Sequence, residues 1–183
     1  MSGRSPREDV AEVLVSEQEI QGALDDLARR VTCDYADKNP LVVGVLTGAF
    51  MFMADLVRRL DFPLEVDFVA AASYGDGTVA SGLELTKDCD RDVSGRHVLV
   101  VDDILDSGRT LSMLAELLAE RGAASVRACC LLDKPSRRAV DFNADYVGLE
   151  IPDHFVVGYG LDYAYGYRNL PFVGVLRAEI CRT

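Results

Sequence analysis

The segment from Val98 to Leu111, VLVVDDILDSGRTL, holds the side chains of this chain that are best suited to chemistry. An apolar run leads into two adjacent carboxylates, and a third acid opens a short turn before the next apolar stretch. A glycine-containing turn at a helix N-terminus directs backbone N–H groups and the positive end of the helix dipole at one spot, which makes an anion site of phosphate size. The polar residues of the segment are Asp102, Asp103, Asp106, Ser107, Gly108, Arg109 and Thr110.

The three carboxylates would repel a phosphate, so they should serve other groups: a divalent cation, sugar hydroxyls or a transferred proton. The hydroxyls of Ser107 and Thr110 can add donors to the phosphate site. An alternative is a plain helix start, in which acidic residues favour the helix dipole. Asp102 and Asp103 make that alternative harder to sustain, because carboxylates that end a buried strand need partners.

Strands alternating with helices must position this segment. Continuous Val, Leu and Ile runs predict buried strands, and apolar residues at helical spacing predict helices between them. A capping-box pattern, Ser16 with Glu19, opens the first helix, and Gly122 ends the last one. The predicted strands are 41–46, 65–74, 97–105 and 125–132, the predicted helices are 16–35, 49–60 and 111–122, and short extended pieces are expected near 146–149 and 172–176.

Such buried, apolar strands indicate an α/β protein with a parallel sheet that is covered on both faces. Ligands of these sheets bind at the carboxyl ends of the strands. This rule selects three places: Thr47-Gly48, the segment 102–110, and Asp133-Lys134. The glycine-rich stretch 75–82 is predicted to be a mobile loop.

Length and charge limit the organisation and the function classes. A chain of 183 residues predicts one domain, here residues 13–183 after a disordered tail over residues 1–12. With 30 acidic and 19 basic residues the net charge is −11, which argues against a nucleic-acid binder that works through a basic face.

The sequence also predicts a cytoplasmic protein without a membrane segment. Its least charged stretch, 40–54, is shorter than the roughly 20 residues of a transmembrane helix, and its charged start has no apolar signal core. The 5 cysteines form no CxxC pair and only 2 histidines are present, so reduced thiols are expected rather than a structural zinc site.

Four segments resemble a known enzyme family. The segment 98–111 is similar to the phosphoribosyl pyrophosphate motif of type I phosphoribosyltransferases, two acids followed by a D-[ST]-G-x-T loop. Three others, LTGAFMFMADL (46–56), LLDKPSRR (131–138) and IPDHFVVGYGLDYAYGYRNLP (151–171), resemble the bacterial hypoxanthine-guanine branch of that family in order and spacing. The similarity covers about residues 13–176. It implies the type I phosphoribosyltransferase fold: a central, mostly parallel sheet flanked by helices, with a small hood built from the termini.

The resemblance implies roles for the acidic segment. Asp106 would be the general base that takes a proton from the purine. The loop Ser107, Gly108, Arg109 and Thr110 would hold the ribose 5′-phosphate. Asp102 and Asp103 would bind the ribose hydroxyls, directly or through Mg²⁺, which suits hard oxygen ligands and a pyrophosphate leaving group.

Residues of the other segments would bind the base and the pyrophosphate. Lys134 would donate to the purine 6-oxygen and so favour hypoxanthine or guanine over adenine. Phe155 would stack on the purine and Val156 would contact it through its backbone. Asp162 would reach a second Mg²⁺ and would itself lie near the purine 2-position, and Arg168 would neutralise pyrophosphate.

Two more loops complete the implied site. The backbone amides of Leu46, Thr47 and Gly48 would bind pyrophosphate, and Ser73 with Tyr74 would begin a mobile flap that closes over the reaction. Two residues depart from the family pattern: Thr47 replaces the usual Lys or Arg, and Asp102 replaces the usual Glu. Either change can weaken binding of the pyrophosphate donor.

The function implied is transfer of 5-phosphoribosyl from phosphoribosyl pyrophosphate to N9 of hypoxanthine or guanine, without nucleic-acid or membrane partners. Two alternatives stay open: an enzyme that prefers xanthine or guanine, and a non-catalytic regulator of this fold that senses nucleotides and binds RNA. The resemblance implies a homodimer or homotetramer.

Overall fold

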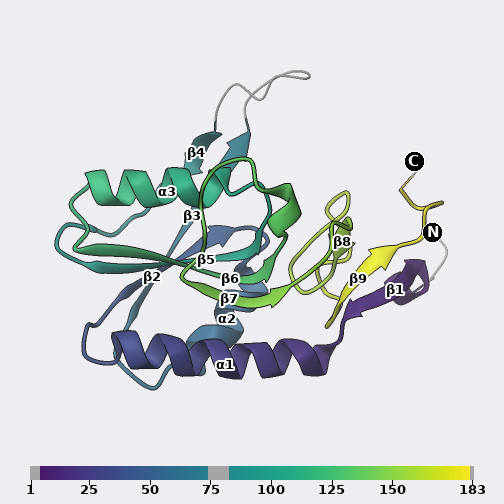
Figure 1. The fold of residues 1–183 in the computed structure, drawn as a ribbon, viewed down its shortest axis with the longest axis horizontal. Coiled ribbons are helices and arrows are strands. Elements are labelled where there is room, and N and C mark those ends of the chain that lie inside the picture. Colours follow the sequence, from purple (N-terminus) through teal and green to yellow (C-terminus); the bar gives the residue numbers. More distant parts are fainter. Residues whose placement is uncertain (1–4, 74–82, 182–183) are drawn as a thin grey trace.

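A computed structural model describes residues 5–73 and 83–181 of the protein (Figure 1). Its centre is a six-stranded sheet in the order β4-β3-β2-β5-β6-β7. All neighbours in this sheet are parallel except β3 and β4, which are antiparallel. The strands are β2 (Leu41–Leu46), β3 (Glu65–Ser73), β4 (Leu83–Lys87), β5 (His97–Leu105), β6 (Ser125–Asp133) and β7 (Tyr146–Glu150). The predicted mostly parallel sheet is confirmed.

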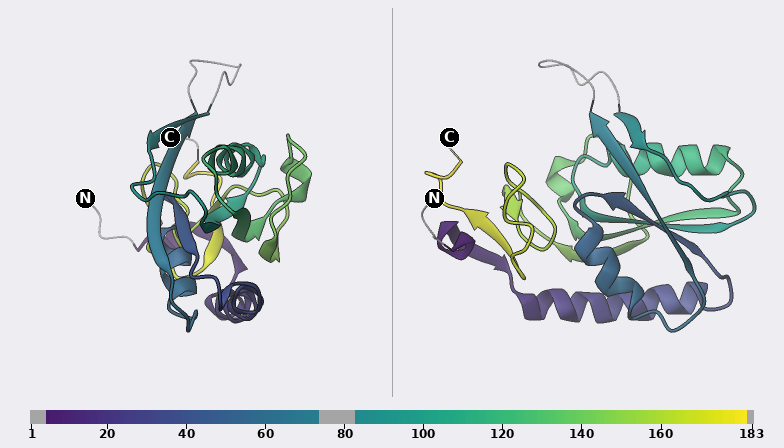
Figure 2. Two further views of the ribbon diagram at one scale, coloured as in Figure 1. Left: turned by 90° about the vertical axis from the view of Figure 1, so that its left-hand side faces the viewer. Right: turned by 180° about the vertical axis from the view of Figure 1, so that it is seen from behind.

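Three helices cover the sheet on both faces, as the apolar strands require (Figures 1 and 2). On one face α1 (Glu17–Tyr35) and α2 (Phe50–Val57) form a core with side chains such as Leu24 and Phe52. On the other face α3 (Arg109–Glu120) forms a second core through Leu111, Leu114 and Leu118. The predicted Ser16–Glu19 capping box is present at the start of α1.

A small antiparallel sheet forms the hood at one end of the molecule (Figure 1). Its order is β1-β9-β8, built from β1 (Val10–Val15), β9 (Val173–Leu176) and β8 (Val156–Val157). The tail predicted over residues 1–12 is therefore corrected: residues 6–9 form the 3-10 helix η1 (Pro6–Asp9) and β1 follows. The reason is a long-range one, because β1 pairs with β9 and its ends, Val10 and Val15, are buried.

Smaller differences from the predicted elements occur at the ends. The second helix is shorter than expected, and β4 and β8 are strands that the sequence did not predict. Tyr74 and the predicted mobile loop 75–82 lie outside the described residues. All 5 cysteines lie in the described part of the chain and are free thiols, as expected. Among the described residues, no helix combines the length and the apolar character needed to cross a membrane.

Candidate active site

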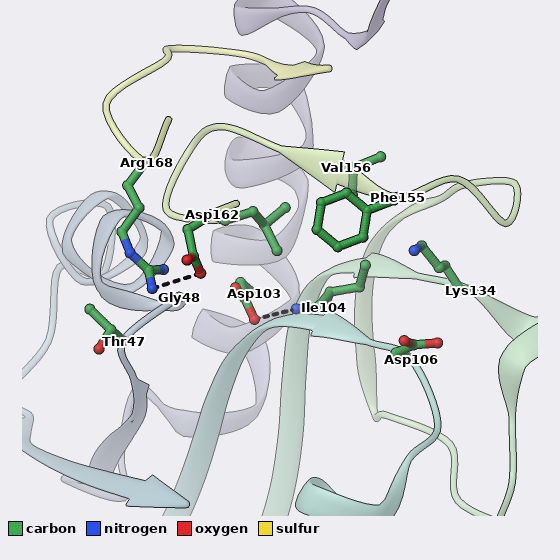
Figure 3. A pocket seen from close by; sticks show the side chains of 11 residues that line it. Thr47, Gly48, Asp103, Ile104, Asp106, Lys134, Phe155, Val156, Asp162 and Arg168 are labelled. Carbon is green, nitrogen blue, oxygen red and sulfur yellow. Dashed lines mark hydrogen bonds and ion pairs between the residues drawn. The ribbon is translucent and has the colours of Figure 1, made fainter. Parts of the chain in front are cut away.

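A cavity of about 310 Å³ lies between the carboxyl ends of the central strands and the hood (Figure 3). The strands β2, β5 and β6 bring their C-terminal loops to this edge of the sheet, and the segment 155–168 approaches from the hood. The lining residues are Thr47, Gly48, Asp103, Ile104, Asp106, Lys134, Phe155, Val156, Leu161, Asp162 and Arg168. The structure thus brings together residues from all four segments that carry the family resemblance.

A smaller cavity of about 60 Å³ adjoins this one at the start of α3. Gly108 is the N-cap of α3 and has φ +82°, a left-handed conformation that favours glycine. Gly108 has no side chain to cap the helix, and the side-chain contact here is a long one of 3.4 Å from Arg109 N–H to Ser107 Oγ, so the helix start can present backbone N–H groups to a ligand. Lining residues are Asp102, Ile104, Leu105, Asp106, Ser107, Gly108, Thr110 and Leu111. The predicted phosphate loop therefore has the geometry of an anion site, although the Arg109 side chain is exposed and lines neither cavity.

The acid pair at the end of β5 divides between the two cavities: Asp102 lines the smaller one and Asp103 the larger. Burial raises the pKa of Asp102 well above its usual value, and the neighbouring Asp103 carboxylate raises it further. Burial also raises the pKa of Asp103. The pair holds its negative charge at a cost that a bound cation or hydroxyl donors would offset.

One end of the larger cavity has the groups expected to hold a purine. Lys134 is buried, and its Nζ donates to the carbonyl oxygen of His154 at 2.6 Å. Phe155 is 58% exposed and meets the ring of Tyr163 edge to face, with the ring centroids 5.8 Å apart. Asp106 lines the same cavity (Figure 3). A cation, a carboxylate and an open aromatic face can together bind a flat heterocycle with donor and acceptor edges.

The opposite end carries the loop after β2 and the hood residues Asp162 and Arg168. These two side chains form an ion pair of 2.7 Å between Arg168 Nη2 and Asp162 Oδ1 (Figure 3). Gly48 packs so closely on Asp103 that a Cβ at residue 48 would overlap the Asp103 carboxylate. The peptide bond between Leu46 and Thr47 is cis. Gly160 is also in tight contact, because its Cβ position would overlap the carbonyl oxygen of Gly48.

Some expected residues lie apart from the cavity. Leu46 ends β2 without lining either cavity, and Ser73 ends β3, where the described part of that strand stops. Arg138, which the sequence did not single out, also contacts the site. Arg138 donates to the carbonyl oxygens of Leu105 at 3.2 Å and Asp106 at 2.6 Å and pairs with Asp133 at 2.5 Å. In the sequence, the only signal for these contacts was the pair Arg137-Arg138 shortly after Lys134.

The mostly parallel sheet, the anion loop after β5 and the acid pair beside it define an α/β protein with an anion site at the carboxyl edge of its sheet. Comparison with known proteins agrees. Residues 11–164 match the family described as the phosphoribosyl transferase domain. The chain therefore belongs to the phosphoribosyltransferase family.

Similar proteins include hypoxanthine and hypoxanthine-guanine phosphoribosyltransferases. The chain is 51% identical to the hypoxanthine-guanine phosphoribosyltransferase of Bacillus subtilis over 175 residues, 95% of this chain and 97% of that protein. The crystal structure of a hypoxanthine phosphoribosyltransferase from Staphylococcus aureus superposes with a TM-score of 0.94 at 42% identity, covering 100% of both chains.

A longer relative also matches. The chain is 54% identical to the bifunctional protein TilS/HprT of Listeria monocytogenes over 177 residues, 96% of this chain. It spans only 27% of the length of that relative.

Proposed function

We propose that this chain transfers the 5-phosphoribosyl group of phosphoribosyl pyrophosphate to N9 of hypoxanthine and guanine, giving IMP or GMP and pyrophosphate. The observation that carries the proposal is one cavity lined by Asp106, Lys134 and Phe155 at one end and by Asp103, Asp162 and Arg168 at the other. A purine and a pyrophosphoryl sugar can occupy these ends side by side. The reaction is then a displacement between two bound substrates, favoured by their proximity.

At the purine end three residues divide the work. Lys134 donates to the 6-oxygen, and a purine with a 6-amino group would leave this buried cation facing another donor. Phe155 stacks on the ring, and the buried backbone of Val156 in β8 contacts it. Asp106 accepts the proton that the purine loses as N9 bonds to C1′ of the ribose. The bond from C1′ to the pyrophosphate oxygen breaks, and its electron pair leaves with pyrophosphate.

At the sugar end the loop from Ser107 to Thr110 holds the 5′-phosphate at the start of α3. Asp102 and Asp103 accept hydrogen bonds from the ribose hydroxyls. The amides of the loop 46–48 and the guanidinium of Arg168 bind the pyrophosphate. The resemblance also implies a substrate-binding role for Ser73 and for Tyr74, which lies outside the described residues.

Mg²⁺ is the metal that these side chains fit. The carboxylates at the cavity, Asp102, Asp103 and Asp162, supply hard oxygen atoms. Among residues 5–73 and 83–181 no three metal-ligating side chains cluster together. Mg²⁺ suits such a site, because it is commonly held by one or two carboxylates with water and substrate phosphates. When bound it would neutralise the charge that develops on the pyrophosphate.

The test is IMP formation from hypoxanthine and phosphoribosyl pyrophosphate with Mg²⁺, beside an Asp106→Asn variant. We expect turnover by the wild type and a loss of about 10²-fold or more in the variant, the scale of losing a general base. The values of kcat/KM for hypoxanthine, guanine and xanthine decide which base is preferred. No turnover with any of the three would reject the enzyme, and a salt-sensitive RNA complex would then favour the regulator.

Assembly and location complete the proposal. We infer a homodimer or homotetramer, which light scattering on the purified chain tests directly. We infer a cytoplasmic location, which fractionation of the source cells tests.

A further inference from the structure

Arg137 lies directly beside the proposed base, although the sequence analysis gives it no role. It ends the 3-10 helix η2 (Pro135–Arg137), which begins one residue after Lys134. Its Nε lies 3.3 Å from Oδ1 of Asp106 and 3.8 Å from Oδ1 of Asp153. Asp153 precedes His154, whose carbonyl oxygen accepts a hydrogen bond from Lys134 Nζ. Arg137 therefore bridges the base to the loop that holds Lys134.

The backbone beneath this contact is fixed on both sides. Lys134 N–H donates to the carbonyl oxygen of Leu105 at 3.0 Å, and Ala139 N–H donates to that of Ser107 at 2.9 Å. These two bonds tie η2 to the loop on either side of Asp106. The backbone that carries Arg137 is therefore held in place beside the loop of Asp106.

The contact uses one oxygen of the carboxylate and leaves the other for a substrate. In the part of the chain that the structure describes, Arg137 is the basic side chain paired with Asp106, and Oδ2 of Asp106 has no hydrogen-bond partner. A planar guanidinium both neutralises a carboxylate and sets its orientation.

We propose that Arg137 is a positioning residue for the phosphoribosyl transfer. It holds the Asp106 carboxylate through Oδ1, so that Oδ2 faces the purine and accepts its proton. Its second contact, to Asp153, fixes the position of the Asp106 carboxylate relative to Lys134 and Phe155. This role rests on the proposed function of the site.

The exposure of the ion pair argues against a purely structural role for Arg137. Its side chain is 55% exposed and that of Asp106 is 42% exposed. Exposed ion pairs contribute about 0–1 kcal/mol to stability. Removing Arg137 should therefore leave the fold intact and act on kcat.

The experiment compares Arg137→Gln and Arg137→Lys with the wild type, each also combined with Asp106→Asn. We expect Arg137→Gln to lower kcat about 5- to 20-fold, less than the roughly 10²-fold loss of the base itself, with little change in KM for phosphoribosyl pyrophosphate. Arg137→Lys should recover part of kcat. In the Asp106→Asn background Arg137→Gln should have no further effect, because the group it positions is gone.

Arg29→Gln is the matched control, since Arg29 forms an exposed ion pair with Asp26 on α1 at 2.7 Å. It should leave kcat unchanged. An unchanged kcat in Arg137→Gln, or an equal fall with and without the Asp106 carboxylate, would overturn the positioning role. Failure of the wild type to form IMP would instead reject the proposed function, so the two results are distinguishable.

Discussion

Two buried aspartates on the strands that flank β2 have opposite electrostatic environments. Asp67 on β3 is 7% exposed and Asp102 on β5 is 8% exposed. Asp67 accepts backbone N–H bonds from Phe68, Asp90 and Arg91 at 2.7, 2.8 and 2.9 Å. It also accepts from Cys89 Sγ at 2.9 Å. Burial raises the pKa of Asp67, but these hydrogen bonds outweigh it, and the pKa lies below its usual value.

Asp102 has few of these donors. Its Oδ1 accepts the N–H of Asp103 at 3.0 Å, while its charged neighbour is another carboxylate. Burial and that neighbour raise its pKa well above the usual value. The difference separates two kinds of buried acid. The fold supplies the hydrogen-bond donors of Asp67, which ties residues 89–91 to β3, whereas Asp102 lacks such a set of donors, as the proposed ligand-binding role requires.

Asp102→Asn tests the ligand side of this comparison and should have the largest effect. We expect kcat/KM for phosphoribosyl pyrophosphate to fall about 10²-fold, because one charge around the ribose and its metal is lost. The free energy of unfolding should stay equal or rise, since an amide avoids the cost of a buried charge. Steady-state kinetics and urea unfolding at neutral pH measure both. A variant that lost stability but kept kcat/KM would show that Asp102 is a structural acid like Asp67.

Asp67→Asn tests the structural side. The amide cannot accept all the donors that converge on Asp67, so we expect a loss of about 2 kcal/mol in the free energy of unfolding. The kcat should be unchanged, because Asp67 lines neither cavity of the site. Asp90→Asn is the control, because its side chain is 82% exposed and its ion pair with Lys87 should matter little. A fall in kcat at full stability would contradict this assignment.

Gly48→Ala tests how the second acid of the pair is held. The added Cβ overlaps the Asp103 carboxylate, so either the loop 46–48 or Asp103 must shift. Overpacking of this kind costs about 1–3 kcal/mol, and we expect kcat/KM for phosphoribosyl pyrophosphate to fall about 10-fold. Gly22→Ala is the matched control, because, apart from its chain neighbours and the adjacent backbone of α1, no atom lies within 4 Å of its Cβ position. An unchanged kcat/KM would mean that the contact of Gly48 with Asp103 has no role in donor binding.

Local sequence signals predicted much of this arrangement. The apolar strands 41–46 and 97–105 and the capping box at Ser16 depend on neighbouring residues, and the structure has all three. The acidic segment after β5 could be selected because a strand, a glycine turn and a helix meet there. The strand-end rule also selected the position of Lys134, but its role, and Phe155 altogether, came from the resemblance.

What the sequence did not predict depends on distant partners. The strand β1 pairs with β9, which lies more than 150 residues away, and half of the residues of β1 are exposed. Apart from the N–H of the adjacent Phe68, the donors to Asp67 come from residues 89–91, beyond β4. Arg137 and Arg138 read as surface charges until η2 is placed against the loop of Asp106. Such contacts arise only when the tertiary fold is formed.

The pH dependence of stability gives the smallest and most specific test of the comparison. The pKa of Asp67 is lowered by folding, so its contribution is present above the ordinary value of about 3.9 and is lost as pH falls through the folded pKa. The pKa of Asp102 is raised, so stability associated with it is present below about 3.9 and is lost as pH rises through the folded pKa. Urea unfolding of the wild type, Asp67→Asn and Asp102→Asn across this range measures both slopes. The wild type should lose its advantage in free energy of unfolding over Asp67→Asn as the pH falls. The free energy of unfolding of Asp102→Asn should increase relative to that of the wild type as the pH rises towards neutral. Parallel curves for the three proteins would mean that neither carboxylate changes its proton affinity on folding, and the contrast between the two sites would fail.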